Sequence, residues 1–223
     1  MNYFINSYTK DDLGLVSEKT FSDSIVISKN HRLRSKNIGE SLSKINSFFF
    51  EFLQQYNLPL PEIIQKELVR FVHQPLSIFP FKLKVLNSVD TRNSVILSKK
   101  EFEQISTPIF EFYVGDCLEY FVSDSHLITL NLCDANEVKL MLRIASKANV
   151  VLKSFFERRN FYLLEFNCFF GKLDDKIFLV GDFSPFGIFI KDMENSELEP
   201  NPYKLTNSKL FGKYTAIIFK LLY

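Results

Sequence analysis

Residues 161–189, FYLLEFNCFFGKLDDKIFLVGDFSPFGIF, place the polar groups Glu165, Asn167 and Asp182 among many phenylalanines. Read with the two-residue period of a strand, Glu165 and Asn167 share one face with Phe169. A pair of carboxylates can act as general acid and base, or can hold Mg²⁺ together with phosphate. The pattern leaves three alternatives: a degenerate catalytic site, a site rebuilt for another substrate, or a strand with one solvent-exposed face.

A hairpin has to position these groups. Residues 171–175, GKLDD, form the predicted turn, and the returning strand carries Asp182. We therefore predict that Glu165 and Asp182 face the same cleft, where large aromatic side chains join them. The aromatic residues expected to line this cleft are Phe169 on the first strand, and Phe186 and Phe189 in the loop beyond the second.

Basic residues mark two other segments. Apolar side chains alternate with Lys82 and Lys84, so residues 80–87 are predicted to form a strand with two lysines on one face. Together with Arg92, these lysines are candidates for binding an anionic part of a substrate. The segment KNHRLRSK, residues 29–36, is predicted to be a basic loop on the surface.

Helical periodicity appears three times, between and after the strands. Residues 38–52 repeat apolar side chains every three or four positions, and residues 210–221 do the same. Asp134 and Glu137 form a predicted capping box that opens the longest helix, residues 135–159. Strands first, followed by helices mixed with hairpins, indicate an α+β fold.

The composition bounds the class of protein. A chain of 223 residues with 46% hydrophobic and 24% charged residues is long enough to bury a sizeable core. Its net charge of +1 gives no reason to expect nucleic acid or a membrane as partner. The cysteines are odd in number and lack zinc spacing, which favours a reducing cytoplasm. They are Cys117, Cys133 and Cys168.

General chemical motifs are absent. The seven glycines include no phosphate-cradling pattern such as GxGxxG. No metal site is predicted, because the three histidines are scattered and no two share the spacing of helical metal ligands. No signal peptide is predicted at the start, and no apolar run is long enough to span a membrane. These motifs alone leave an α+β domain without an assigned activity.

Five segments nevertheless resemble, in order, the motifs of the SAICAR synthetase family, an ATP-dependent ligase family of purine synthesis that joins aspartate to a carboxylated aminoimidazole ribotide. They are the helix at residues 39–59, FPFKLKVLNSV (79–89), TPIFEFYV (107–114), KANVVLKSFF (147–156) and LLEFNCFFGK…KIFLVGDFSPFG (163–187). The resemblance implies a two-lobed fold of antiparallel sheets with flanking helices. The expected lobes are residues 1–80 and 81–223, with a cleft near residues 77–80.

The resemblance implies that a few residues of this sequence match site residues of the family. Glu165 stands at the aspartate of the family's V-D-F motif, and Asp182 stands at the glutamate of D-E-x-S-P in shortened form. Asn87 matches the asparagine of V-R-N, and Ser184 with Pro185 matches the S-P turn. We expect Glu165 and Asp182 to be the catalytic residues. The expected substrate-binding residues are Lys82, Lys84, Asn87, Arg92, Asn167, Phe169, Ser184, Phe186 and Phe189.

At other positions the chain departs from the family. Asn167 replaces the lysine of D-F-K, and Phe169 replaces a glutamate that contacts magnesium and nucleotide. Phe186 and Phe189 replace an aspartate and an arginine. The N-terminal G-K-A-K motif, whose lysines hold ATP phosphates, has no counterpart in MNYFINSY. We therefore expect the ATP-phosphate site to be largely lost, with no cofactor unless the ligase activity survives with ATP and Mg²⁺.

Three functions remain open. The first is a repurposed enzyme of the family scaffold, acting on a small molecule in a specialised biosynthetic pathway. The alternative is a non-catalytic binding or regulatory protein whose cleft is filled by phenylalanines. The least favoured is an orthodox SAICAR synthetase. A small-molecule ligand is the expected partner, and a homo-oligomer is left open.

Overall fold

A nine-stranded antiparallel sheet, with a two-stranded sheet beside it, organises the part of the chain that the structure describes. The structure is a computed structural model, and it describes residues 8–11, 13–28, 31–114, 120–194, 199–205 and 207–222. The strands of the large sheet are β1 (Tyr8–Lys10), β2 (Val16–Thr20), β5 (Ile63–Lys66), β6 (Arg70–Ser88), β7 (Gln104–Val114), β8 (Tyr120–Val122), β9 (Phe161–Leu173), β10 (Lys176–Leu179) and β11 (Ile188–Asp192). The small sheet pairs β3 (Ser24–Ser28) with β4 (His31–Arg34).

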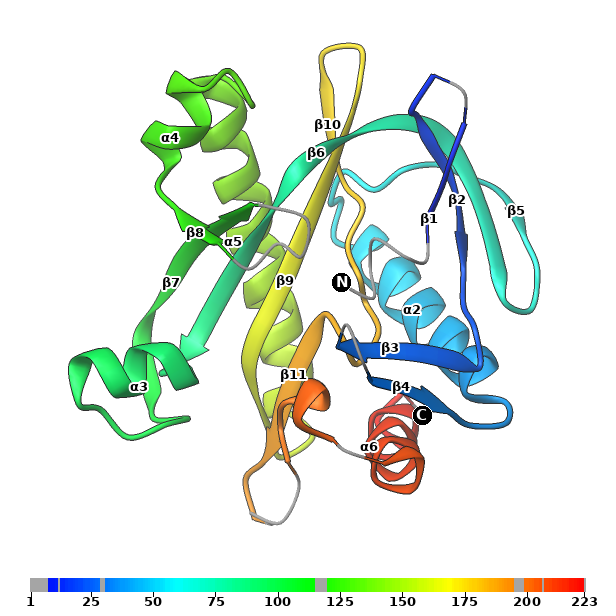
Figure 1. Ribbon diagram of the computed structural model, residues 1–223, viewed down its shortest axis with the longest axis vertical. Coiled ribbons are helices and arrows are strands. Elements are labelled where there is room, and N and C mark those ends of the chain that lie inside the picture. The colour runs from blue at the N-terminus through cyan, green and yellow to red at the C-terminus, as the bar shows by residue number, and fades with distance from the viewer. Residues whose placement is uncertain are drawn as a thin grey trace.

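The 19-residue strand β6 joins the two halves of the large sheet. Its first part pairs with β2 and β5, and its second part pairs with β7 and β9. The register with β9 shifts between Ile78 and Lys82, where Pro80 cannot donate a backbone hydrogen bond to the ladder. In Figure 1, β6 crosses the upper part of the molecule and then runs down beside β9.

Helices bury one face of this sheet. The helices are α2 (Ile38–Gln54), α3 (Thr91–Leu97), α4 (Asp124–Thr129), α5 (Ala135–Glu157) and α6 (Ser208–Lys220), and η1 (Pro202–Lys204) is a short 3₁₀ helix. The buried side of α5 carries Met141, Ala145, Ala148 and Leu152, which join the apolar residues of β6 and β9 in the main core. Figure 1 shows α5 behind β6 and β9.

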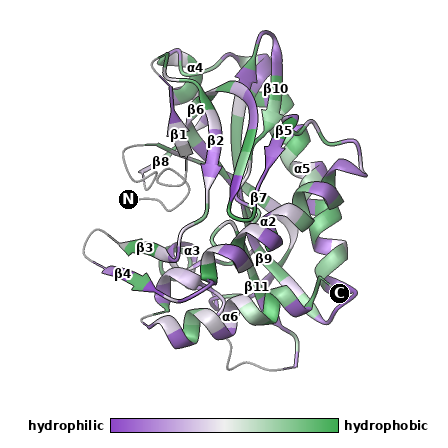
Figure 2. Cartoon of the chain, turned by 90° about the vertical axis from the view of Figure 1, so that its right-hand side faces the viewer, coloured by the Kyte–Doolittle hydropathy of each residue, from purple (hydrophilic) through white to green (hydrophobic). Residues whose placement is uncertain are grey.

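The other two long helices, α2 and α6, each pack through one stripe of apolar side chains. In Figure 2, hydrophobic and hydrophilic residues alternate along α2 and α6, as expected for helices with one buried side. Leu42, Ile45, Phe49 and Leu53 form the buried stripe of α2. The two helices contact each other.

The structure confirms the α+β class of antiparallel strands with flanking helices. It also confirms the capping box of α5: the Asp134 carboxylate accepts from the backbone of Glu137, whose own carboxylate accepts from the backbone of Asp134. The boundary predicted after residue 80 falls inside β6, and the division into two lobes stays a prediction. No helix in the described residues is long and apolar enough to cross a membrane.

Three local predictions were wrong. Asp182, predicted on the returning strand of the hairpin, lies beyond the end of β10 at Leu179. Residues 31–34 of the predicted basic loop form strand β4, because the alternation of Leu33 with charged neighbours fits a strand with one buried side; residues 29 and 30 lie outside the described part. Phe189 lies in strand β11 rather than in a loop. It pairs with Glu165 of β9, so β9 has β11 as a partner beyond the end of β10.

Candidate functional site

The face of the large sheet opposite α5 carries a row of polar side chains. Lys84 of β6 lies between Glu111 of β7 and Asn167 of β9 in the strand register. One pair further along, Lys82 lies between Tyr113 and Phe169. Because neighbouring strands hold directly opposed side chains on the same face, these residues share one surface. The intervening residues of β6 and β9 point the other way, into the core.

Glu165 is held in this row by two neighbours. Its side chain accepts a hydrogen bond from the Asn167 amide at 2.9 Å, and the Lys84 ammonium lies 3.4 Å from its other oxygen. Lys84 also lies 3.9 Å from the carboxylate of Asp90, which precedes α3. Glu165 is 8% exposed, so this carboxylate is oriented by protein groups rather than by bulk water.

Tyr113 lies beside both lysines. The ammonium groups of Lys82 and Lys84 lie 5.3 and 4.9 Å from the centre of its ring, within the range of cation–π attraction. Its hydroxyl donates to Glu111 at 2.7 Å, and Glu111 also forms an ion pair with Arg92. Burial, followed by the contact with Glu111, raises the pKa of the Tyr113 phenol above its usual range.

Asp182 occupies a second, deeper cluster. Its carboxylate lies 3.4 Å from the Lys19 ammonium of β2 and accepts from the backbone N–H of Ser184 at 3.1 Å. The Asn46 side chain of α2 accepts from Lys19 at 3.4 Å and from the backbone of Phe183 at 3.3 Å. Burial lowers the pKa of Lys19, and the charge of Asp182 opposes that shift. Three distant segments thus meet around one ion pair.

Tyr203 of η1 connects the two clusters. Burial raises the pKa of its phenol well above the usual range, and the charges of Asp182 and Glu165 add to that shift. The ring centre lies 5.3 Å from that of Phe186 and 6.1 Å from that of Phe189. Two predicted aromatic residues therefore lie beside this buried phenol, and the charges of both predicted carboxylates act on it.

The other predicted residues have clear positions. Ser184 is fully buried, and its hydroxyl accepts from the backbone of Phe186 at 3.3 Å, so it shapes the turn after Asp182. Arg92 contacts Glu111 and lies 4.8 Å from the ring of Phe121. Asn87 lies apart from the row. Its amide exchanges two 2.8 Å hydrogen bonds with Asn149 of α5, on the opposite face of the sheet.

Glu111 and Tyr113 of the row were not among the predicted site residues, and Lys19, Asn46 and Tyr203 were also missed. Lys19 and Asn46 each had a signal, because each is a polar residue at the position expected to be buried in an amphipathic element. By two-residue alternation Lys19 shares a strand face with Leu15 and Phe21, and Asn46 follows Ile45 on the buried side of α2. Tyr203 had no such signal, since η1 has no periodicity that the sequence reveals.

The described residues contain no group of three or more histidine, cysteine or acidic side chains that could hold a metal ion. Mg²⁺ is commonly bound by one or two carboxylates together with substrate phosphates. Asp182 and Glu165 could supply such carboxylates. The donor set therefore fits Mg²⁺ only as part of a complex with a phosphate-bearing ligand.

Comparisons with known proteins agree on one family. The family model for SAICAR synthetase matches residues 18–197. The phosphoribosylaminoimidazole-succinocarboxamide synthase of Persephonella marina is 27% identical over 188 residues, which cover 80% of this chain and 76% of that protein. The enzyme of the same name from Listeria welshimeri is 27% identical over 187 residues, covering 82% and 79%.

Solved structures share the fold. SAICAR synthetase from Pyrococcus horikoshii superposes with a TM-score of 0.84 at 22% identity, covering 93% of this chain and 92% of that one. The phosphoribosylaminoimidazole-succinocarboxamide synthase of Ehrlichia chaffeensis gives 0.83 at 20% identity, covering 96% and 98%. A type-2 SAICAR synthetase in complex with ADP gives 0.83 at 21% identity, covering 96% and 92%.

Proposed function

Because this chain belongs to the SAICAR synthetase family, we propose that it is a repurposed enzyme of that scaffold. Its substrate is a small molecule of a specialised biosynthetic pathway and differs from that of the named relatives. Phe169, Phe186 and Phe189 support a changed substrate, because they stand where the resemblance expects charged residues. We also place the protein in the cytoplasm, on the strength of its cysteine pattern.

The observation that carries the proposal is the pair of buried carboxylates, each paired with a lysine of a strand that is distant in sequence. Glu165 pairs with Lys84, and Asp182 pairs with Lys19. Buried ion pairs contribute little net stability, because desolvation offsets their attraction. Clusters of buried ionisable groups are instead typical of functional sites. Their presence favours a working site over one that has merely decayed.

Each residue has a role in this proposal. Glu165 serves as general acid or base, oriented by Lys84 and Asn167. Lys82 and Lys84 attract an anionic part of the substrate beside the ring of Tyr113. Tyr203 and the neighbouring phenylalanines exclude water from the space between the carboxylates.

We propose that any phosphate site is reduced to Lys19 and Asp182. The ADP complex of a type-2 SAICAR synthetase supports a nucleotide as the ligand to test first. Lys19 would hold phosphate, while Asp182 and Glu165 would hold Mg²⁺ with it. When bound there, the ion would neutralise the phosphate charge. Each missing electrostatic contact typically costs about 10²–10³ in rate, so turnover with ATP should be slow.

A binding or regulatory protein is the second candidate. It is favoured by Phe186, which is 2% exposed and stacks on Phe211 with ring centres 5.0 Å apart. A stacked, buried ring beside Tyr203 leaves less room for a substrate. An orthodox SAICAR synthetase is the third candidate, supported by the names of the relatives.

One set of measurements separates the three. A thermal-shift screen with nucleotides, aspartate and ribotides identifies ligands, because a ligand that binds only the folded state raises the midpoint. Mass spectrometry then follows product formation from each ligand, with and without ATP and Mg²⁺. We expect turnover of a ligand other than the carboxylated ribotide with aspartate, and we expect Glu165→Gln and Asp182→Asn to abolish it.

The surface variant Glu157→Gln serves as the matched control and should keep that turnover. Formation of the succinocarboxamide product would establish the orthodox function. Ligand binding without turnover, unchanged in Glu165→Gln, would establish the binding protein.

A further inference from the structure

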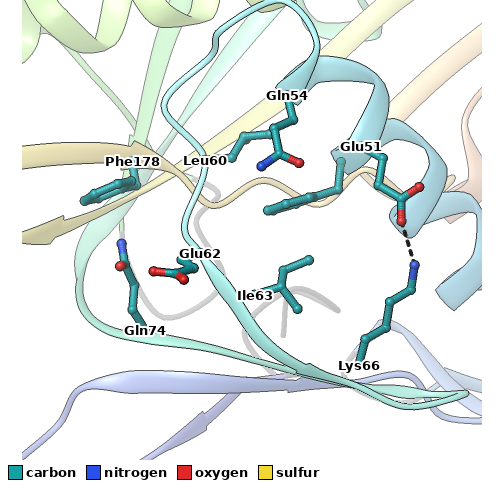
Figure 3. A pocket seen from close by; sticks show the side chains of 9 residues that line it. Glu51, Gln54, Leu60, Glu62, Ile63, Lys66, Gln74 and Phe178 are labelled. Atoms are coloured by element: carbon teal, nitrogen blue, oxygen red, sulfur yellow. Dashed lines mark hydrogen bonds and ion pairs between the residues drawn. The ribbon is translucent and has the colours of Figure 1, made fainter.

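An open cavity of about 570 Å³ lies between α2, the β5–β6 hairpin and β10 (Figure 3). Its volume is within the range of about 300–1,000 Å³ that is usual for small-molecule sites. Its lining residues are Phe50, Glu51, Gln54, Leu60, Glu62, Ile63, Lys66, Gln74 and Phe178. None of them belongs to the Glu165 and Asp182 clusters, so this cavity is separate from the site of the proposed function.

The walls combine an apolar surface with a polar rim. Phe50, Leu60, Ile63 and Phe178 supply aromatic and aliphatic surface from three different elements. Phe50 is anchored in the main core and is 7% exposed, so this wall is fixed. Apolar walls with a few polar groups are the usual composition of a ligand pocket.

The charges of the rim do not cancel. Glu51 and Lys66 form an ion pair at 2.7 Å and neutralise each other. Glu62 forms no ion pair with any residue in the part of the chain that the structure describes, and its backbone is fixed by a hydrogen bond from Gln74. The cavity therefore carries one uncompensated negative charge.

The uncompensated charge lies at one end of the cavity. In Figure 3, Glu62 lies with Gln74 and Phe178, while the Glu51–Lys66 ion pair lies at the opposite end. A carboxylate beside an aromatic ring is suited to an organic cation, which the ring attracts through its negative face. An anion would meet Glu62, and the Lys66 ammonium in the lining is already paired with Glu51.

We propose that this cavity binds a small organic monocation with a flat apolar body, such as an amidine or a primary amine on an aromatic ring. The cationic group lies between the Glu62 carboxylate and the Phe178 ring, and the side-chain oxygen of Gln74 accepts one of its hydrogens. The apolar body covers Phe50, Leu60 and Ile63.

Three probes of equal shape and different charge test the proposal. Benzamidine is cationic, benzamide is neutral and benzoate is anionic. Saturation-transfer NMR and calorimetry on the full chain should give measurable binding of benzamidine, weaker binding of benzamide and none of benzoate. Equal binding of all three, or no binding of benzamidine at millimolar concentration, would overturn the proposal.

Variants locate the site. Glu62→Gln removes the charge from an exposed side chain and should weaken benzamidine binding about threefold to fivefold, as for a solvent-accessible ion pair. Glu62→Lys should reverse the preference, so that benzoate binds and benzamidine does not. Glu103→Gln removes an exposed carboxylate that does not line the cavity and should leave all three affinities unchanged. An equal loss in Glu62→Gln and Glu103→Gln would contradict the site.

Discussion

Lys19 and Asp182 form an ion pair whose side chains are 4% and 2% exposed. Removing one partner leaves the other charge buried without compensation, which typically costs about 3–5 kcal/mol. We therefore expect Lys19→Met and Asp182→Asn each to lower the free energy of unfolding by about 3 kcal/mol. The double variant should lose less than the sum, because the two residues share one interaction.

Urea denaturation measures these differences. Lys66→Met provides the comparison, since Lys66 pairs with Glu51 at the surface, where ion pairs contribute little. A loss for Lys19→Met no larger than that for Lys66→Met would contradict the assignment.

His73 gives a prediction for the dependence of stability on pH. Burial lowers the pKa of its imidazole, the charge of Lys19 lowers it further, and a hydrogen bond to the carbonyl of Gln74 opposes both. Because the folded pKa lies below the ordinary value of about 6.5, the unfolded state binds the proton more tightly. The stability from neutral His73 is present above pH 6.5 and is lost as pH falls through the folded pKa.

The measurement compares urea midpoints at pH 7.5 and at about pH 5. His73→Gln should reduce the difference between the two midpoints, whereas His126→Gln, which changes an exposed histidine, should leave it as in the unaltered chain. If both variants behave alike, the buried imidazole is not the source.

At the scale of elements, the turn after β10 depends on a close backbone approach. A Cβ at Gly187 would lie 1.7 Å from the carbonyl oxygen of Asp182. Gly187→Ala must therefore displace the segment that carries Asp182, and we expect a loss of about 2 kcal/mol or more, as for an overpacked interior. Thermal and urea unfolding measure the loss.

Gly212→Ala is the matched control for that variant. Gly212 lies in α6 with nothing within 4 Å of the added Cβ, so the substitution should stabilise by about 0.5–1 kcal/mol. A destabilisation of equal size in both variants would show that the turn has no special requirement.

The sequence predicted those elements whose patterns are local. Apolar periodicity located α2 and α5, and the alternation around Lys82 and Lys84 located the second half of β6. It missed the extension of β6 back to Arg70, because that part pairs with β2 and β5 and contains Pro75, which a strand pattern does not predict. It also missed α3, which has no buried residue and hence no apolar stripe to reveal it.

The site was predictable only in part, for a related reason. Strand alternation placed Glu165, Asn167 and Phe169 on one face, and the register of β6 and β9 shows that arrangement. Which groups from distant segments would meet them depends on the topology. Lys19 of β2 meets Asp182 across a separation of 163 residues, and no local pattern encodes that meeting.

At the scale of the whole molecule, nucleotide binding is the sharpest test of divergence. We expect Mg-ATP to bind weakly or not at all, with a dissociation constant above about 100 µM. The reason is the missing G-K-A-K motif, together with Phe169, where the family resemblance expects a glutamate. Calorimetry with Mg-ATP and Mg-ADP measures the affinity. A low-micromolar value would favour the ligase reaction of the named relatives.

The strand β6 also has a consequence for how the chain matures on the ribosome. The first half of β6 is synthesised after β2 and β5, so it can pair with both strands at once. One edge of the second half pairs with β9, which is synthesised only after α5. Until β9 is synthesised, Lys84 cannot form its ion pair with Glu165. A nascent chain that stops before residue 161 therefore displays an open strand edge, the kind of surface that chaperones and proteases recognise.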